Sequence, residues 1–211
     1  MQPILLGVDG LGYGGFMECE TATLLSLVNS MERGVVENHA PQSEQSAWSS
    51  VLMMDGPDPA SSALIKATKA VPINLPITNP TFGLVSIAMD ESTPPSEEVG
   101  KVIDAVISAS RNRPVIASIT ALERFLHVKP QLKCEIYSVI DEGIRKLVSS
   151  EDIGHLIIFS PFGEPQSQRE GDHYDYGVYL STMPRPRHHD TVKIHEIGQL
   201  FLDMVEASQY R

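Results

Sequence analysis

Short, uninterrupted apolar runs alternate along this chain with segments whose apolar residues recur at helical spacing. Such runs are typical of strands buried on both faces of a parallel sheet, because a strand with one solvent face alternates apolar and polar residues. Strand and helix in this order predict an α/β fold with right-handed crossovers. The expected strands are Pro3–Val8, Gly34–Glu37, Leu84–Ala88, Val115–Ile119, Leu156–Phe159 and Val178–Thr182.

The segments between these runs are predicted helices. The clearest is the C-terminal one, where residues such as Ile194, Ile197 and Phe201 repeat along one apolar face. Two segments, 71–83 and 163–172, show neither pattern and are predicted loops. The helices are expected at residues 18–31, 44–54, 59–69, 97–111, 133–149 and 192–207.

Length and charge narrow the class of protein. A chain of 211 residues suits one domain, residues 1–211, and its net charge of −11 contains no run of Lys or Arg. This argues against nucleic acid and against an anionic membrane surface as partners. No apolar stretch is long enough for a membrane span, and the start has no signal-peptide pattern. Cys19 and Cys134 lie far apart, so we expect two reduced thiols in a cytoplasmic protein.

The stretch "LLGVDGLGYGGF" allows three interpretations. Gly10, Gly12 and Gly15 fit the G-x-G-x-x-G pattern of a dinucleotide loop, and Glu37 could hold a ribose hydroxyl. Asp9 argues against this site, because a carboxylate before the first glycine would repel a pyrophosphate. The glycines could instead make a tight turn between strand and helix. In the third interpretation, Asp9 is a carboxylate at the end of a strand that binds a metal ion.

A series of motifs runs through most of the chain. The segment "PQSEQSAWSSVLMMDGPDPASSAL" is in register with P-x-x-T-x-P-A-W-x-S followed by T-G-x-x-P-x-x-H-G. Further on, "VPINLPITNP" fits N-L-P-x-T-x-P, "ITALERFLHV" fits T-x-x-D-R-x-x-H, and "HYDYG" fits H-x-x-x-G. In this order the motifs resemble the alkaline phosphatase superfamily, most closely its type I phosphodiesterase and nucleotide pyrophosphatase branch. The residues in register in the first segment are Pro41, Ala47, Trp48, Ser50, Gly56 and Pro59.

The resemblance implies a three-layer α/β sandwich with a mostly parallel central sheet. Members of this branch carry insertions that form a cap over the substrate pocket. The region between residues 83 and 114 is too short to hold them. We therefore expect an alkaline-phosphatase-like core without cap insertions.

The resemblance also implies a catalytic site that is only partly retained. Hydrolysis in the family needs two metals, and one is held by a strand-end aspartate, a Thr or Ser nucleophile and the Asp-His pair of S-D-H-G. Asp9 matches the aspartate, whereas Glu44 stands at the nucleophile position, with Ser43 beside it out of register. The S-D-H-G position reads "SPFG", so both ligands there are missing. A carboxylate can act as a nucleophile, but Glu44 would stand where an anionic phosphate enters.

The second metal set is better retained. Glu123 replaces the family aspartate, His127 follows four residues later, and His173 supplies the third ligand. One Glu and two His suit zinc, manganese or iron and leave an open position for water. The alternative is an inert remnant without metal, in which His127 lies on the surface and His173 in a loop. We therefore expect one divalent metal, zinc or manganese, or none.

Two functions follow from the resemblance. The first is a degenerate, non-catalytic protein that acts in binding, regulation or assembly with a protein partner or a second copy of itself. It is favoured because the nucleophile and the Asp-His pair are missing together. The alternative is a metal-dependent phosphoesterase in which Glu123, His127 and His173 hold a metal that activates water. A dinucleotide-binding protein is a third, weaker hypothesis.

Overall fold

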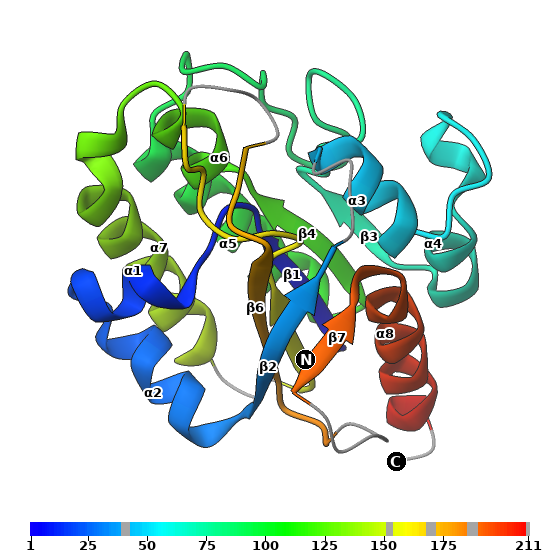
Figure 1. The fold of residues 1–211 in the computed structure, drawn as a ribbon. Helices are drawn as coiled ribbons and strands as arrows, with labels where there is room; N and C mark the ends of the chain where they lie inside the picture. The colour runs from blue at the N-terminus through cyan, green and yellow to red at the C-terminus, as the bar shows by residue number, and fades with distance from the viewer. Residues whose placement is uncertain (39–42, 151–153, 168–171, 185–189, 210–211) are drawn as a thin grey trace.

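The computed structural model describes every residue except 39–42, 151–153, 168–171, 185–189 and 210–211. It has one seven-stranded sheet in the order β3-β4-β1-β5-β6-β2-β7, with helices on both faces (Figure 1). Among these strands only β6 runs against its neighbours, so the predicted α/β sandwich with a mostly parallel sheet is confirmed. The strands are β1 Ile4–Val8, β2 Glu32–Glu37, β3 Val71–Ile73, β4 Val115–Ile119, β5 Leu156–Phe159, β6 Tyr176–Ser181 and β7 Thr191–Lys193.

The helices divide between two hydrophobic cores, one on each face of the sheet. Side chains alternate along β1, so Ile4 and Leu6 lie in one core and Leu5 in the other. A strand buried on both faces must be apolar at every position, which explains the uninterrupted apolar runs in the sequence. One face carries α1 Tyr13–Glu18, α2 Ala22–Ser30, α5 Pro95–Ser110, α6 Ala121–Leu126 and α7 Lys133–Val148, and the other carries α3 Glu44–Val51, α4 Ala63–Thr68 and α8 Ile194–Gln209.

Three predicted segments differ from the structure. The expected strand at Leu84–Ala88 is not a strand, and Leu84 is 66% exposed. The edge strand is β3, inside the expected loop 71–83, where Pro72 masks the strand pattern. Proline is tolerated at a sheet edge because it need not donate to a ladder hydrogen bond. The expected helix at 18–31 is α2, which begins only at Ala22, and the separate helix α1 ends at Glu18 because the backbone is extended at Cys19.

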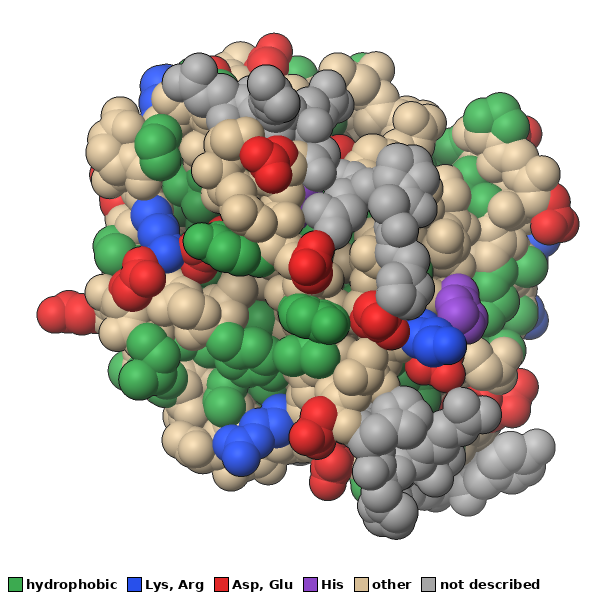
Figure 2. All heavy atoms as spheres, viewed as in Figure 1, with side chains coloured by type: hydrophobic (Ala, Val, Ile, Leu, Met, Phe, Trp, Pro, Cys, Tyr) green, Lys and Arg blue, Asp and Glu red, His purple; other side chains and the backbone are tan. Residues whose placement is uncertain are grey.

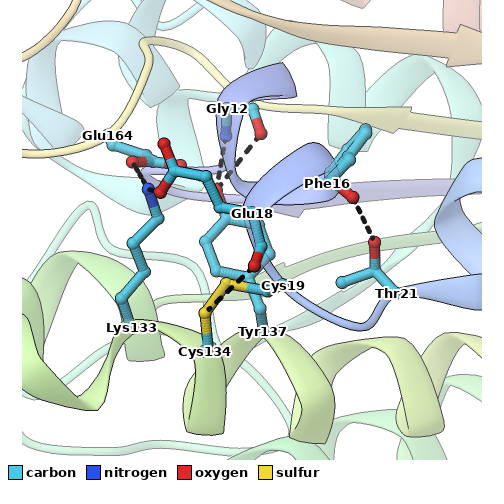
Figure 3. Close-up of a disulfide and its surroundings, with 9 residues drawn as sticks. All are labelled: Gly12, Phe16, Glu18, Cys19, Thr21, Lys133, Cys134, Tyr137 and Glu164. Carbon is cyan, nitrogen blue, oxygen red and sulfur yellow. Dashed lines mark hydrogen bonds and ion pairs between the residues drawn. A yellow bond between two sulfur atoms is a disulfide. The ribbon is translucent and has the colours of Figure 1, made fainter.

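The two cysteines form a disulfide, so the expectation of reduced thiols is wrong. Cys19 at the end of α1 and Cys134 in the first turn of α7 lie 5.0 Å apart between Cα atoms, although 115 residues separate them in sequence (Figure 3). Only the fold brings them together. Structural disulfides are rare in cytosolic proteins, so this bond runs against the cytoplasmic expectation, which stays a prediction.

The surface agrees with the acidic composition. On the face shown in Figure 2, Asp and Glu side chains are spread widely, and the described Lys and Arg side chains form no continuous patch. Within the described part of the chain, no helix is both long enough and apolar enough to cross a bilayer.

Candidate metal site at the carboxyl edge of the sheet

The motif residues meet at one edge of the sheet, because the parallel strands β1, β4 and β5 all end there. Asp9 follows β1, and its neighbour β4 leads directly into α6, which carries Glu123. Glu44 arrives on the first turn of α3 from the other helix layer, and His173 lies just before β6. Ligand sites of open α/β sheets form at this edge.

Glu123 is the centre of a three-residue cluster. Its Oε1 lies 2.9 Å from Nε2 of His127, four residues later on α6, and its Oε2 lies 2.7 Å from Nε2 of His173. The side chains of Glu123, His127 and His173 are 4%, 12% and 0% exposed. The three residues that the motif resemblance assigns to one metal set therefore do converge, and direct hydrogen bonds join them.

The donor set and its surroundings fit a divalent metal. One ligand atom from each residue lies within 4.8 Å of the other two, and a carboxylate with two imidazole nitrogens is a common zinc donor set. Nδ1 of His127 lies 2.6 Å from the carbonyl oxygen of Ser167. A carbonyl can only accept, so Nδ1 donates to it. Nε2, which donates to Glu123 in the metal-free protein, is then the atom that would exchange its proton for a metal.

The ring of His173 is fixed by packing rather than by hydrogen bonds alone. It lies against Phe162, with ring centroids 4.0 Å apart, and edge-on to His127 at 5.2 Å. Its Nδ1 is buried and has no hydrogen-bond partner among the described residues. The aromatic contact therefore orients Nε2 toward Glu123.

Glu44 joins this cluster through its carboxyl group. Burial, a hydrogen bond to Glu123 and the charges of Glu123 and Asp9 raise the pKa of Glu44 to about 9. Burial also tends to raise the pKa of Glu123, but hydrogen bonds from His127, His173 and Glu44 outweigh it and hold that pKa well below its usual range. At neutral pH Glu44 is therefore the protonated donor and Glu123 the ionised acceptor.

Ser43, the second candidate at the nucleophile position, has a structural role. It is the N-cap of α3, and its side-chain oxygen accepts a hydrogen bond of 3.3 Å from the backbone N–H of Ser46. An oxygen engaged in a helix cap is poorly placed to attack a substrate. Pro41, part of the same motif, lies outside the described residues.

Asp9 lies in a different environment at the same edge. It is completely buried, and Nε1 of Trp48 donates to its two carboxylate oxygens at 3.0 and 3.1 Å. The hydroxyl of Ser118 donates to Oδ2 at 3.2 Å. Burial, together with the nearby charges of Glu123 and Glu98, raises the pKa of Asp9 well above its usual range, although the two donors oppose this.

A glycine in β1 makes this arrangement possible. A Cβ on Gly7 would lie 2.2 Å from the indole ring of Trp48, so a larger residue there would displace the ring. Gly7 thus leaves room for the Trp48 ring beside the strand, where its Nε1 reaches Asp9. The apolar sequence pattern around Trp48 gives no sign of this contact.

The "SPFG" segment contributes no metal ligand. The hydroxyl of Ser160 accepts from the backbone N–H of Leu11 at 3.1 Å and donates to the carbonyl of Phe162. Phe162 is buried in the same apolar core as Trp48 and Phe159. Apolar packing therefore stands where the family motif has an aspartate and a histidine.

A cleft of about 410 Å³ opens beside the Glu123 cluster. Arg124 is one of its lining residues, but its guanidinium is already used: it pairs with Glu98 at 2.6 Å and bonds to the side chain of Thr120. An anion in the cleft would therefore find this charge neutralised. Other lining residues are Glu44, Ile77, Asn79, Met89, Glu123 and His127.

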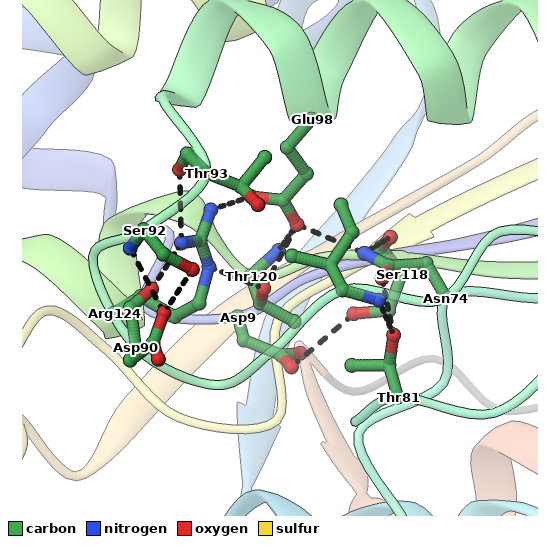
Figure 4. Close-up of polar contacts among 11 residues, drawn as sticks. Asp9, Asn74, Thr81, Asp90, Ser92, Thr93, Glu98, Ser118, Thr120 and Arg124 are labelled. Atoms are coloured by element: carbon green, nitrogen blue, oxygen red, sulfur yellow. Dashed lines mark hydrogen bonds and ion pairs between the residues drawn. The ribbon is translucent and has the colours of Figure 1, made fainter. Parts of the chain in front are cut away.

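The Glu98–Arg124 pair belongs to a buried network that motif reasoning did not identify (Figure 4). Oε1 of Glu98 accepts from the backbone N–H of Thr120 at 2.6 Å and from the amide of Asn74 at 2.9 Å. These bonds tie α5 and the loop after β3 to the start of α6. They fix the helix that presents Glu123 and His127, and a buried pair of this kind needs every one of its partners.

Comparison with known proteins gives the fold but no close relative. No protein-family model matches the sequence, and no curated protein matches it. Several solved structures are similar. The PH0037 protein of Pyrococcus horikoshii has a TM-score of 0.63 at 12% identity, with 97% of this chain and 96% of that chain covered.

Two further structures share the fold at lower identity. The alkaline phosphatase of the Antarctic bacterium TAB5 has a TM-score of 0.62 at 9% identity, covering 97% of both chains. Murine ectonucleotide pyrophosphatase/phosphodiesterase 5, an inactive form in complex with AMP, has a TM-score of 0.65 at 9% identity, covering 98% of this chain and 95% of that one. The chain therefore has an alkaline-phosphatase-like fold, as its motifs predict.

Proposed function

We propose that this chain is a non-hydrolytic protein that binds one divalent metal through Glu123, His127 and His173 and acts by binding rather than by catalysis. One observation carries the proposal: the two carboxylates that the motif resemblance implies as metal ligands, Asp9 and Glu123, have different partners. Glu123 contacts two imidazole nitrogens that can coordinate a metal. Asp9 contacts an indole N–H and a hydroxyl, and the indole N–H can only donate.

The residues at the nucleophile position support the non-hydrolytic part of the proposal. Ser43 caps a helix, and Glu44 is bonded through its proton to Glu123. A protonated carboxyl is a poor nucleophile, and an ionised one would repel an entering phosphate. Two-metal hydrolysis also needs a second cation to stabilise the attacking or leaving oxygen, and the "SPFG" segment offers no ligand for it.

A bound metal would supply positive charge at the edge of the cleft, next to the carboxylate of Glu123. The protein's own residues would orient it: the Ser167 carbonyl fixes the ring of His127, and Phe162 fixes the ring of His173. The ligand in the cleft is proposed to be a protein segment or part of a second copy. Cytoplasmic location is kept only as a proposal, since the disulfide disfavours it.

A metal-dependent phosphoesterase is the second candidate, and the cleft favours it. About 410 Å³ of space adjoins both Glu44 and His127, and a site with three protein ligands leaves a position open to water. In this case Glu44 would hold or move a proton beside the substrate.

Metal titration and an activity assay separate the two candidates. We expect metal-stripped protein to bind one zinc ion per chain in calorimetry, and His127→Ala to bind none. We expect no turnover of nitrophenyl phosphate mono- or diesters with added zinc or manganese. Metal-dependent turnover that is lost in Glu44→Ala would establish the phosphoesterase, and wild-type protein that binds neither metal would refute the metal site.

A further inference from the structure

A paired segment next to the cluster controls both histidines. Residues 163–167 and 172–174, here called the histidine hairpin, pair antiparallel through an isolated bridge between Pro165 and His173. The backbone N–H of Tyr174 bonds to the carbonyl of Glu164 at 3.1 Å. The hairpin provides His173 itself and also the Ser167 carbonyl that fixes His127. Its position therefore decides whether the cluster can assemble.

Glu164 holds this hairpin to α7. Its Oε1 accepts a hydrogen bond of 2.6 Å from the hydroxyl of Tyr137, and its Oε2 pairs with Nζ of Lys133 at 2.7 Å (Figure 3). The hydroxyl of Tyr137 in turn accepts from the backbone N–H of Gly12 at 2.9 Å. Glu164 thus joins the hairpin, α7 and the glycine loop after β1 at one point.

Glu164 is a charged residue that is nevertheless buried. Glu164 is only 8% exposed, and burying a carboxylate is unfavourable unless hydrogen bonds and an opposite charge compensate for the lost water. Glu164 is absent from the residues that line the cleft, and it is not among the metal-type ligands. Its side-chain hydrogen bond and its ion pair both lead to α7.

A glycine and a disulfide make the α7 side of this contact rigid. A Cβ on Gly15 would lie 2.1 Å from the ring of Tyr137, so the glycine allows the ring its buried place. Cys134 follows Lys133 directly and is linked to Cys19 on α1. The two groups that hold Glu164 are therefore attached to a cross-linked pair of helices.

We infer that Glu164 is a positioning residue for the metal site. Its bonds to Tyr137 and Lys133 hold the histidine hairpin where His173 and the Ser167 carbonyl reach Glu123 and His127. The inference rests on the proposed metal site and adds that α7, which provides no ligand, sets the affinity of that site for metal.

The test compares two glutamates that share one lysine. Glu164→Gln removes the charge that pairs with Lys133 from the hairpin. Glu18→Gln removes the other carboxylate that pairs with Lys133; Glu18 lies 2.6 Å from Nζ of Lys133, and its side chain is 64% exposed. We expect Glu164→Gln to weaken zinc binding about tenfold, the lower range for groups that orient metal ligands. Glu18→Gln is expected to leave the affinity within about twofold, since exposed ion pairs contribute little. Tyr137→Phe, which keeps the ring, should weaken zinc binding in the same direction as Glu164→Gln.

A metal-free measurement separates this inference from the metal proposal. Amide hydrogen exchange at Gln166 and Tyr174, whose N–H groups bond across the hairpin, should be faster in Glu164→Gln than in wild type and unchanged in Glu18→Gln. If wild type binds no zinc but exchange responds in this way, the metal proposal fails and the positioning role stands. If both glutamate variants match wild type in exchange and in zinc affinity, the positioning role is refuted.

Discussion

Asp9 and Glu123 are two buried carboxyl groups at the same edge of one sheet, with 0% and 4% exposure, and they differ almost only in their partners. Asp9 faces an indole N–H and a hydroxyl, and Glu123 faces two imidazole nitrogens. An imidazole nitrogen can exchange a proton for a metal, and an indole nitrogen cannot. Burial of a carboxyl group alone is therefore not enough for the metal site that we propose.

The ionisation of the two groups follows the same difference. Burial raises the pKa of Asp9 well above its usual range, whereas hydrogen bonds outweigh burial and hold the pKa of Glu123 well below it. A cation is attracted to the carboxyl that is already ionised. The difference between the two carboxyl groups predicts that metal binds on the Glu123 side only.

The largest effect should come from removing a metal ligand on one side. His173→Ala should weaken zinc binding more than about 100-fold, because a lost ligand costs more than the 10- to 100-fold of a lost orienting group. Asp9→Asn, which keeps the shape, should leave zinc affinity nearly unchanged. Calorimetry of both variants measures this. Equal losses in the two would mean that Asp9 and the Glu123 cluster form a single site.

Removing the indole donor should cost stability without affecting metal. Trp48→Phe leaves the buried carboxyl of Asp9 without its shared donor, which costs about 1–3 kcal/mol. We expect the free energy of unfolding in urea to fall by about this amount while zinc affinity is kept. A variant that gained a second zinc ion would show instead that Trp48 is what blocks metal at Asp9.

The stability of the fold should depend on pH through the hydrogen-bonded pair of Glu44 and Glu123. Folding raises the pKa of Glu44 from 4.5 to about 9, so the folded state keeps a proton that the unfolded state loses in this window. This contribution to stability is present below pH 4.5 and is lost as the pH rises toward 9. Glu44→Gln keeps a donor toward Glu123 and does not titrate.

We expect Glu44→Gln to remove most of this slope and to melt higher than wild type at pH 8. The gain in melting temperature should be about 2–4 °C, which corresponds to roughly 1 kcal/mol for a chain of this size. It should be no larger, because water in the open cleft screens the repulsion between Glu44 and Glu123. Thermal melts of metal-free protein at pH 6 and pH 8 measure it. Parallel curves for the two proteins would contradict the proton-sharing pair.

The smallest effect is expected at Ser43. Ser43→Ala removes the N-cap of α3 and should cost about 1 kcal/mol of unfolding free energy. Zinc affinity should not change, since the hydroxyl bonds to Ser46 and not to the cluster. Loss of an enzymatic activity in this variant alone would restore Ser43 as a nucleophile.

Local patterns predicted the parts of the molecule that local forces determine. The strands Val115–Ile119 and Leu156–Phe159 lie where the apolar runs predicted them. A strand that is buried on both faces needs an apolar residue at nearly every position, so the run is visible in the sequence. Glu123 and His127 could be paired from sequence, since a four-residue spacing puts two side chains on one helix face. His173 could be added only through the motif resemblance.

Long-range contacts could not be predicted in this way. The Cys19–Cys134 bond, the Trp48–Asp9 bond and the Glu164–Tyr137 bond join residues from 27 to 115 positions apart. Each depends on how helices are stacked rather than on spacing along the chain. Glycines at positions 7 and 15 were the available signal, since each makes room for a large ring, but a glycine does not say which ring it admits.

The contact between Trp48 and Asp9 has an optical consequence. Trp48 is the chain's single tryptophan, and its indole is buried with its nitrogen bonded to the carboxyl of Asp9. All tryptophan fluorescence therefore originates beside Asp9, and its emission wavelength responds to the ionisation and contacts of that one group. Zinc bound at Glu123 would leave this emission largely undisturbed, whereas a cation at Asp9 would pull the carboxyl from the indole and shift it. The protein thus carries its own reporter on the half of the site that we propose stays free of metal.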